Sequence, residues 1–563
     1  MRILITYLFL SCLMHLPAWT QELSLKLPES SGESLVIYCD REIYGLSEQI
    51  HYYASYSAPV ELEEASWSSV LYMELISWDG TKQASSKVHI KHGGASGILM
   101  VPENIPSGVY YLRAYTLWMR NYSPLSYTYL PLKILNPYSQ EMLARPAEGD
   151  SNPQPLAHTS TEIVDGIVFS GLMDQYECRE QVNFEIQISE ELRSGSFSLG
   201  IAKTQGQSSA EYTIEPISEA KTGSGEIEFL PEINGLTLSG SVVNGINNEP
   251  VPDARMQVSS YANPFFFAEV ITGKDGSFLY ALPHFTGNPE LHIIEASDSS
   301  SNHKIQLTSE FCNKPVRLPY VPLRFDSTEQ SILKEILINT QLKDRYREND
   351  SNIELSDSLL PAFYGNGASI TYVRDYIELS SLREFIYEII PQVSIQDNSK
   401  GSYINIQGPS CMDIYPPLIL MDNVPVPNNE ELLSIPSNRI ERIEVLNQAY
   451  MVGNTRYSGI LSIYSTKKDM SGLAQEGERH FFNLRMLDDN NPVFEYELTA
   501  KEASSPDIRN LLYWEPGIRF SEEGKFLVNL STPDTPGQYV VTVSGTDSEN
   551  RANVLIKAMI LVK

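Results

Sequence analysis

Basic residues are scarce in this chain relative to acidic ones. It has 563 residues, of which 41 are Lys or Arg and 71 are Asp or Glu, so its formal net charge at pH 7 is −30. A surface with this excess of negative charge repels phosphate backbones and anionic headgroups. The composition therefore excludes nucleic acid and anionic lipid as direct partners, and it suits a soluble extracytoplasmic protein.

Long apolar runs are also rare, and one of them stands at the start of the chain. Residues 1–20 carry Arg2, an apolar core and then the small residues Ala18 and Thr20. This order is typical of a secretory signal peptide with cleavage near Thr20; lipidation of Cys12 is the alternative. No later run reaches the ~18 apolar residues of a spanning helix. We therefore expect a mature chain in the periplasm or at the outer membrane, without a transmembrane segment.

Only five cysteines are present, and four of them follow the predicted signal peptide. They form no Cys-x-x-Cys pair and are spread along the chain, at Cys39, Cys178, Cys312 and Cys411. This spacing predicts buried or half-buried thiols. A disulfide stays open as the alternative, because the expected compartment is oxidising.

Motifs for catalysis or metal binding are missing. The nine histidines are dispersed and give no His-Glu-x-x-His pattern. The segment around Ser458 lacks the Gly-x-Ser-x-Gly of a nucleophile elbow, and Glu441 and Glu444 are predicted on opposite faces of one strand. We therefore expect a protein that is not an enzyme and that has no catalytic residues, no cofactor and no metal site.

What the chain does contain is short apolar runs separated by turn-forming residues. Hydrophobic residues make up 42% and aromatic residues 10% of the sequence, which is enough for real cores. Alternating β-branched and aliphatic residues predict strands, and their spacing predicts β-sandwiches. The predicted fold class is mainly β, with tandem immunoglobulin-like or macroglobulin-like sandwiches plus a small α+β domain. The predicted boundaries are 1–20 for the signal peptide, 21–137, 161–229, 230–312 and 470–563 for four sandwiches, 138–160 for a linker, 313–366 for a helical connector and 367–469 for the α+β domain.

The predicted α+β domain contains an amphipathic helix followed by strands. Within Ser380–Val393, apolar residues recur at spacings of three and four, and Pro391 ends the pattern. Three short apolar runs follow, Pro416–Val426, Asn438–Asn447 and Tyr457–Lys468, with turn formers between them. We expect these runs to form strands of one small buried sheet.

In this order, the segments resemble the plug domain of TonB-dependent outer-membrane receptors. The matching pieces are "YINIQG", "PLILMDNVPV", "RIERIEVL" and "SGILSIYSTK". Asn423 stands where the family has Gly, and Asn tolerates a positive φ better than most residues. The resemblance implies a plug inside a barrel of about 22 strands. Such a barrel needs over ~200 residues, whereas roughly 95 follow Lys468, so we expect a plug-like domain without its barrel.

Two motifs in the first sandwich resemble the MG2 domains of α2-macroglobulin-like proteins, in the variety found in Bacteroidetes-type extracytoplasmic proteins. They are Asp40–Ile50 ("DREIYGLSEQI") and Pro106–Asn121 ("PSGVYYLRAYTLWMRN"). A partial internal repeat, Tyr44–Tyr52 against Tyr176–Phe184, predicts a second macroglobulin-like sandwich.

The third sandwich resembles carboxypeptidase regulatory-like domains, a structural family from which no peptidase chemistry follows. The matching residues are Gly240, Val242, Pro250, Val251, Ala254, Asp275, Gly276 and Phe278. Its turns are expected at residues 247–250 and 274–276. In the last sandwich, Arg509–Gly545 resembles the terminal immunoglobulin-like module found beside MG2 domains.

The segment Cys178-Arg179-Glu180-Gln181 superficially resembles the Cys-x-Glu-Gln thioester of macroglobulins, which would make the chain a covalent trap. Arg179, however, stands where those proteins have Gly, and the surroundings are strand-like. The segment "LSEQ" at Leu46–Gln49 repeats the pattern without a cysteine. A shared strand-start pattern is therefore the favoured interpretation.

Candidate partner-docking residues come from two places. Phe265, Phe266 and Phe267 are consecutive in a predicted strand, where neighbours point to opposite faces. They form either core or interdomain packing, or an exposed docking edge. Asp422 and Asn423 belong to the plug-like face that would contact a partner.

These observations predict an adaptor or accessory subunit of a Bacteroidetes-type cell envelope. It would bind an outer-membrane barrel protein or envelope complex by strand pairing or surface complementarity. Two alternatives stay open. One is macroglobulin-like capture of a ligand or protease. The other is a plug component of a TonB-dependent transport system whose barrel is on another chain.

Overall fold

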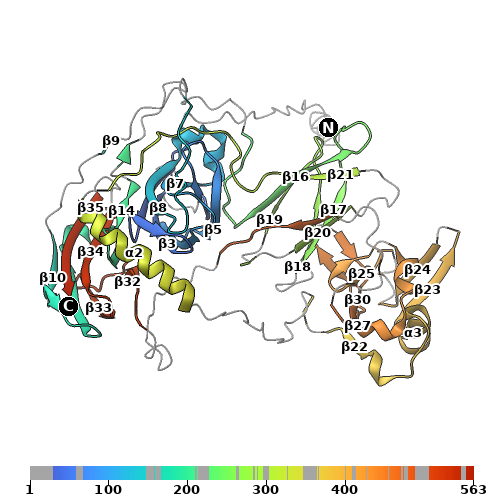
Figure 1. Ribbon diagram of the computed structural model, residues 1–563. Helices are drawn as coiled ribbons and strands as arrows, with labels where there is room; N and C mark the ends of the chain where they lie inside the picture. The colour runs from blue at the N-terminus through green and yellow to red at the C-terminus, as the bar shows by residue number, and fades with distance from the viewer. Residues whose placement is uncertain are drawn as a thin grey trace, which may run out of the picture.

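The computed structural model consists of β-sandwiches and one small α+β module (Figure 1). It describes residues 30–58, 67–147, 157–158, 166–209, 212–213, 227–260, 266–282, 286–287, 290–295, 303–325, 327–346, 364–365, 367–399, 401–408, 414–426, 428–453, 455–468, 470, 473, 480–488, 506–546 and 553–563. The predictions for the signal peptide at residues 1–20, for Cys12, for Phe265 and for Cys411 lie outside the described residues. No helix in the described ranges is both long and apolar enough to cross a membrane.

The first sandwich packs a sheet of order β14-β1-β3-β6 against a sheet of order β2-β8-β7-β4-β5. Its strands are β1 (Ser34–Cys39), β2 (Ile43–Gly45), β3 (Gln49–Ser57), β4 (Val70–Ile76), β5 (Lys82–His89), β6 (Gly94–Met100), β7 (Gly108–Tyr115) and β8 (Thr128–Leu135), with β14 (Gln207–Ser208) added at one edge. β4 and β5 pair antiparallel as a hairpin with Asp79 and Gly80 at its tip, where Gly80 has a φ of 85°.

The second sheet of this sandwich is covered on both faces. All residues of β4 and β7 are buried, although a sheet with one solvated face would alternate. The outer cover is the extended chain after Cys312: Leu318 N donates to Trp78 O at 2.7 Å, and the Tyr111 hydroxyl donates to Pro319 O at 2.7 Å. The predicted connector is therefore part of the first sandwich's packing.

The second sandwich combines two segments that lie far apart in the sequence. One sheet has the order β10-β12-β33 and the other β11-β35-β34-β13-β32. The early strands are β10 (Ile167–Ser170), β11 (Gln175–Tyr176), β12 (Gln181–Ile188) and β13 (Ser196–Ala202), and the late ones are β32 (Leu511–Glu515), β33 (Lys525–Ser531), β34 (Gly537–Thr546) and β35 (Asn553–Val562). A further pair, β9 (Ala157–His158) with β15 (Tyr212–Thr213), stands apart.

This pairing differs from the predicted boundaries, which gave residues 161–229 and 470–563 a sandwich each. β13 pairs with both β32 and β34, and β12 pairs with β33. The physical reason is burial: Val182, Phe184 and Ile186 need an apolar face to cover them, and one core joins them to Val528, Val541 and Val543. In the described residues of each segment, the strands close a core only together with those of the other segment.

The third sandwich follows the predicted local pattern. Its sheets have the orders β19-β16-β21 and β18-β17-β20-β31. The strands are β16 (Thr237–Asn244), β17 (Arg255–Ser260), β18 (Phe266–Ile271), β19 (Ser277–Ala281), β20 (Glu290–Glu295), β21 (His303–Leu307) and β31 (His480–Asn483). Positive φ values at Asn248 and Gly276 confirm the two predicted turns. β31 is the difference, since it falls within the predicted last sandwich but pairs with β20 here.

Helix α2 (Ser327–Tyr346) confirms the predicted connector helix and joins the first two sandwiches. Ile336 is fully buried against Ile43 and Leu135 of the first sandwich. On the other side, the Lys203 ammonium pairs with Glu335 at 2.5 Å, and Asn339 Nδ2 donates to Asn510 Oδ1 at 2.9 Å.

The α+β module spans residues 364–470. Its main sheet has the order β22-β27-β30-β25-β26. The elements are β22 (Ser369–Tyr372), α3 (Leu382–Ile389), β23 (Val393–Asn398), β24 (Gly401–Ile406), β25 (Leu418–Met421), β26 (Val424–Pro425), α4 (Asn429–Leu433), β27 (Ile440–Leu446), β28 (Tyr450–Val452), β29 (Thr455–Tyr457) and β30 (Ile460–Ser465). The predicted helix and the three predicted strand runs are all present.

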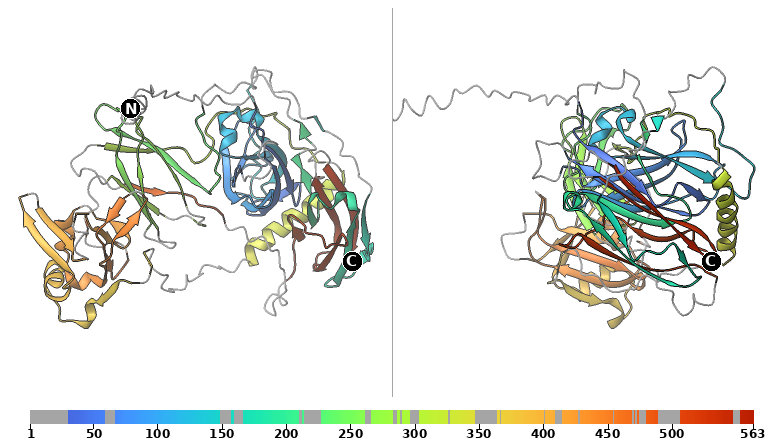
Figure 2. Two further views of the ribbon diagram at one scale, coloured as in Figure 1. Left: turned by 180° about the vertical axis from the view of Figure 1, so that it is seen from behind. Right: turned by 90° about the vertical axis from the view of Figure 1, so that its left-hand side faces the viewer.

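The modules follow one another in space in a different order from the chain. The second sandwich lies at one end, followed by the first sandwich, the third sandwich and then the α+β module (Figures 1 and 2). The chain enters the α+β module after β21 and returns from it into β31, so this module is an insertion in the third sandwich.

Candidate functional site

The predicted docking phenylalanines are buried inside the chain. Phe266 packs in the large core of the first and third sandwiches, whereas Phe267 packs against Leu418, Leu420 and Tyr457 of the α+β module. The two side chains thus point to opposite faces of the strand, as predicted. Neither face is an exposed docking edge, because other parts of the same chain cover both. The prediction of an exposed partner site at Phe266 and Phe267 is therefore corrected to interdomain packing.

Asp422 and Asn423 form a tight turn between β25 and β26, with φ values of 48° and 67°. Their exposed fractions are only 3% and 2%. The Asp422 carboxylate accepts bonds from Ser465 N at 2.8 Å, Ser465 Oγ at 2.6 Å and Met470 N at 2.8 Å. These residues therefore close the module onto its return segment and are not a surface for a partner.

The thioester-like segment forms a turn before β12. Arg179 has a φ of 59°, and its guanidinium contacts both carboxylate oxygens of Asp534, at 2.6 and 2.7 Å. Gln181 Oε1 accepts a bond from Ser531 Oγ at 3.1 Å. Cys178 is a free, half-buried thiol, and Cys39 and Cys312 are free and buried. The strand-start interpretation fits this geometry, and the described cysteines form no disulfide.

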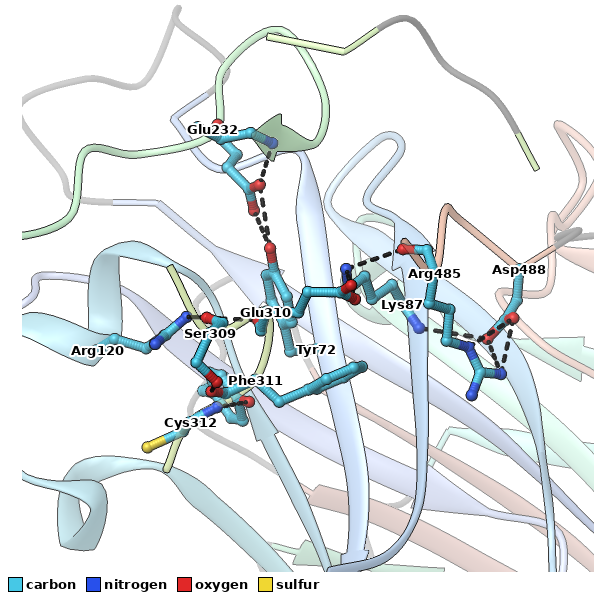
Figure 3. A network of polar contacts seen from close by, with 12 residues as sticks. Tyr72, Lys87, Arg120, Glu232, Ser309, Glu310, Phe311, Cys312, Arg485 and Asp488 are labelled. Carbon is cyan, nitrogen blue, oxygen red and sulfur yellow. Dashed lines mark hydrogen bonds and ion pairs between the residues drawn. The ribbon is translucent and has the colours of Figure 1, made fainter. Parts of the chain in front are cut away.

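A buried polar network joins the first and third sandwiches (Figure 3). Glu232, which is 1% exposed, lies at its upper end. Its carboxylate accepts bonds from the Tyr72 hydroxyl at 2.9 Å and from Thr237 N at 2.7 Å, so it bridges β4 and β16. Burial raises the pKa of Glu232 to about 7, although these hydrogen bonds and the charges of Lys87 and Arg120 oppose the rise.

Lys87 is the second member of this network. Its ammonium group donates to Glu310 Oε2 at 2.8 Å and to Arg485 O at 2.9 Å. Burial lowers the pKa of Lys87, and the Glu310 carboxylate partly offsets that effect. The backbone of Lys87 also pairs with Asp488, whose N donates to Lys87 O at 2.7 Å. Lys87 thus ties β5 to the segment that returns from the α+β module.

Arg120 is the third member, on the short 3-10 helix Trp118–Asn121. Its guanidinium donates to the backbone carbonyls of Ser309 at 2.9 Å and Glu310 at 3.4 Å, and it lies 4.2 Å from the centre of the Phe229 ring. No ion pair joins it to a carboxylate among the described residues.

A cavity of about 340 Å³ opens beside these three side chains. Its wall includes Tyr72, Lys87 and Arg120 from the first sandwich, Thr237 and Ser309 from the third, and Asn483 from β31. Volumes of ~300–1,000 Å³ are typical of small-molecule sites. Sequence reasoning missed this site. The sequence feature that could have revealed it is a charged residue within an apolar strand or turn, such as Arg120 directly after Trp118 and Met119.

The α+β module carries exposed apolar side chains at its outer end. Ile370 on β22, Tyr387 on α3 and Tyr403 on β24 are exposed, as are Tyr376 and Ile377 in the loop after β22, and Ile377 and Tyr387 reach 77% and 79%. These elements lie on the side of the module away from the third sandwich (Figures 1 and 2). The module also has a complete core of its own beneath them.

Comparisons with known proteins give only distant structural matches. No family model matches the chain, and no curated protein matches it. Escherichia coli α2-macroglobulin activated by porcine elastase is 9% identical, with 94% of this chain and 44% of that one covered and a TM-score of 0.24. Salmonella α2-macroglobulin reacted with methylamine is 8% identical, with coverages of 97% and 40% and a TM-score of 0.24.

A third match is dimeric latent PorU from Porphyromonas gingivalis, 10% identical, with 51% and 34% coverage and a TM-score of 0.16. This chain thus spans less than half the length of these three proteins. TM-scores this low carry no argument about fold or function. The macroglobulin, carboxypeptidase regulatory-like and plug resemblances therefore still rest on the sequence motifs.

Proposed function

We propose that this chain is a non-enzymatic adaptor or accessory subunit of a cell envelope, which binds an outer-membrane protein complex through the outer end of its α+β module. The observation that carries the proposal is the group of exposed apolar side chains at Ile370, Tyr376, Ile377, Tyr387 and Tyr403. Large exposed apolar side chains over a complete core are characteristic of protein interaction surfaces, and Tyr is enriched at such surfaces.

The placement of the module supports the same function. It lies at the end of the molecule, and its opposite side is fixed to the third sandwich by Phe267 and by hydrogen bonds from Gln257 Nε2 to the Tyr457 hydroxyl, at 3.1 Å, and from that hydroxyl to Glu269. A firmly held module with an apolar outer end is suited to docking, because little conformational freedom is lost on binding.

The alternatives gain less support. Covalent capture in the macroglobulin manner requires a thioester at Cys178, whereas Arg179 and Gln181 of that segment are engaged with Asp534 and Ser531. Gating of a barrel on another chain would use the same outer end of the α+β module. It is therefore a narrower form of the adaptor proposal.

The test is cross-linking mass spectrometry on intact envelopes that contain the tagged full chain. We expect cross-links from residues 370–403 to an outer-membrane protein. The double variant Ile377→Ser with Tyr387→Gln should reduce recovery of that protein at least ~10-fold, as expected for loss of two central contacts. The matched control, Val168→Ser with Leu527→Gln, removes exposed apolar side chains from the second sandwich and should leave recovery unchanged.

Two results would contradict the proposal. One is recovery of no membrane protein from envelopes that contain the folded chain. The other is equal loss of recovery in the α+β-module variant and in the control, which would place the binding surface elsewhere.

A further inference from the structure

The cavity between the first and third sandwiches has more positive than negative charge on its wall. Lys87 pairs with Glu310, at 2.8 Å. Arg120 is 4% exposed, and its guanidinium contacts the backbone carbonyls of Ser309 and Glu310 and the Phe229 ring. A buried guanidinium without an anionic partner is costly, because its loss of hydration is not repaid by a counter-charge.

The other charged groups near this wall do not form an ion pair with the Arg120 guanidinium. The charge of Arg120 acts on the Glu232 carboxylate and opposes the rise in its pKa, but that carboxylate makes its hydrogen bonds with Tyr72 and Thr237. Lys314 places a further cation nearby by donating to Arg120 O at 2.6 Å. Arg485 and Asp488 pair with each other at 2.9 Å. In a chain of net charge −30, a buried arginine with no ion-pair partner among the described residues is an exception that calls for a specific reason.

The wall also offers hydrogen-bonding groups suited to an anion. Thr237, Ser239 and Thr308 line the cavity together with Asn483. The volume of about 340 Å³ is that of roughly ten water-sized groups. It therefore has room for a small molecule.

We propose that this cavity binds a small oxyanion, a carboxylate or a phosphate, with the Arg120 guanidinium as its principal cation and Lys87 as the second. Arg is well suited to this role because its planar fork donates two parallel bonds to a carboxylate or phosphate. The bound anion would contact the first sandwich, the third sandwich and β31 at once. The bound anion would thus stabilise the contact between the first and third sandwiches, which supports the α+β module. This proposal does not depend on the proposed docking function.

The experiment is isothermal titration calorimetry on the full chain with two probes, sodium succinate and inorganic phosphate, each at constant ionic strength adjusted with sodium chloride. We expect saturable binding of at least one probe and a rise in the melting temperature with its concentration. Binding of succinate alone identifies a carboxylate ligand, and binding of phosphate alone identifies a phosphate ligand.

Three variants distinguish binding in the cavity from non-specific binding to positive charge elsewhere on the chain. Arg120→Gln should weaken binding at least ~10-fold, the loss expected for one charge-assisted bond pair. Thr308→Glu places a carboxylate on the cavity wall and leaves Arg120 in place, and it should also weaken binding at least ~10-fold. Arg374→Gln removes an exposed arginine from the α+β module and should bind within about 2-fold of the wild type.

If Arg120→Gln does not fold, Thr308→Glu tests the proposal instead. Thr308 is exposed, so its substitution should leave the fold intact. The proposal is overturned if neither probe binds, or if folded Thr308→Glu binds as tightly as the wild type.

Discussion

Glu232 gives the clearest pH-dependent effect at the scale of a single residue. Its pKa is raised from 4.5 to about 7, so the folded chain keeps this proton over a range in which the unfolded chain has released it. The contribution to stability is therefore complete below about pH 4.5 and is lost as the pH rises towards 7. One pKa unit corresponds to about 1.4 kcal/mol, so a shift of about 2.5 units makes the total loss on the order of 3–4 kcal/mol once the pH has passed 7.

Glu232→Gln should remove this pH dependence. A glutamine keeps an oxygen that accepts from Tyr72 and Thr237 and has no proton to release. We expect the variant to be more stable than the wild type at pH 8, by about 1–3 kcal/mol, and closer to it at pH 5. Urea unfolding between pH 5 and pH 8 measures the difference. The exposed change Glu522→Gln is the control, and equal pH profiles for wild type and Glu232→Gln would refute the assignment.

For single residues, the sequence predicts backbone geometry better than it predicts which charged side chains are buried. Asn423 was expected to tolerate a positive φ, and its φ is 67°. Lys87, Arg120 and Glu232 were not predicted, because their burial comes from segments more than 100 residues away in the chain. A side chain that is paired only in the assembled molecule leaves little trace in its local sequence.

At the scale of elements, Phe267 on β18 holds the α+β module against the third sandwich. Phe267→Ala should cost about 3–5 kcal/mol, since it removes a buried ring and leaves a cavity among Leu418, Leu420 and Tyr457. Hydrogen exchange should increase in β25 and β30. Leu279→Ala on β19 is the control, because Leu279 is 48% exposed and its loss should cost less than about 0.5 kcal/mol. Unchanged exchange in β25 and β30 would show that Phe267 does not hold the module.

Helix α2 offers a second test with a matched pair of isoleucines. Ile336 is fully buried against the first sandwich, whereas Ile338, two residues later, is 54% exposed. Ile336→Ala should weaken docking of the helix by about 2–4 kcal/mol, and Ile338→Ala by less than about 0.5 kcal/mol. Hydrogen exchange of residues 329–342 reports docking. Equal exchange in the two variants would mean that the Ile336 contact contributes little.

Elements defined by local pattern were predictable, and elements defined by distant pairing were not. Helix α3 and the hairpin of β4 and β5 depend on capping, periodicity and turn residues that are neighbours in sequence. β31 and β33 have ordinary strand sequences, and their partners β20 and β12 lie about 190 and 340 residues away. Assigning them to a separate last sandwich was reasonable from contiguity, but burial favoured the distant faces.

At the scale of the whole molecule, the C-terminal strands complete the second sandwich. Deletion of residues 506–563 removes β32 to β35 and exposes Val182, Phe184, Ile186, Phe197 and Leu199. We expect residues 166–209 to lose protection from hydrogen exchange almost completely, with aggregation of the truncated chain. The α+β module should keep its protection, because its core is its own. Retained protection at residues 181–202 would contradict the shared core.

The same shared core has a consequence for biosynthesis. About 300 residues separate β13 from β32, and ribosomes add roughly 5–20 residues per second. The early half of the second sandwich must therefore wait some 15–60 s for its partner strands to be translated. During that delay its apolar strands are open to chaperones and to pairing with other nascent copies, so we expect the early strands β10 to β13 to need protection from aggregation until β32 to β35 have been translated.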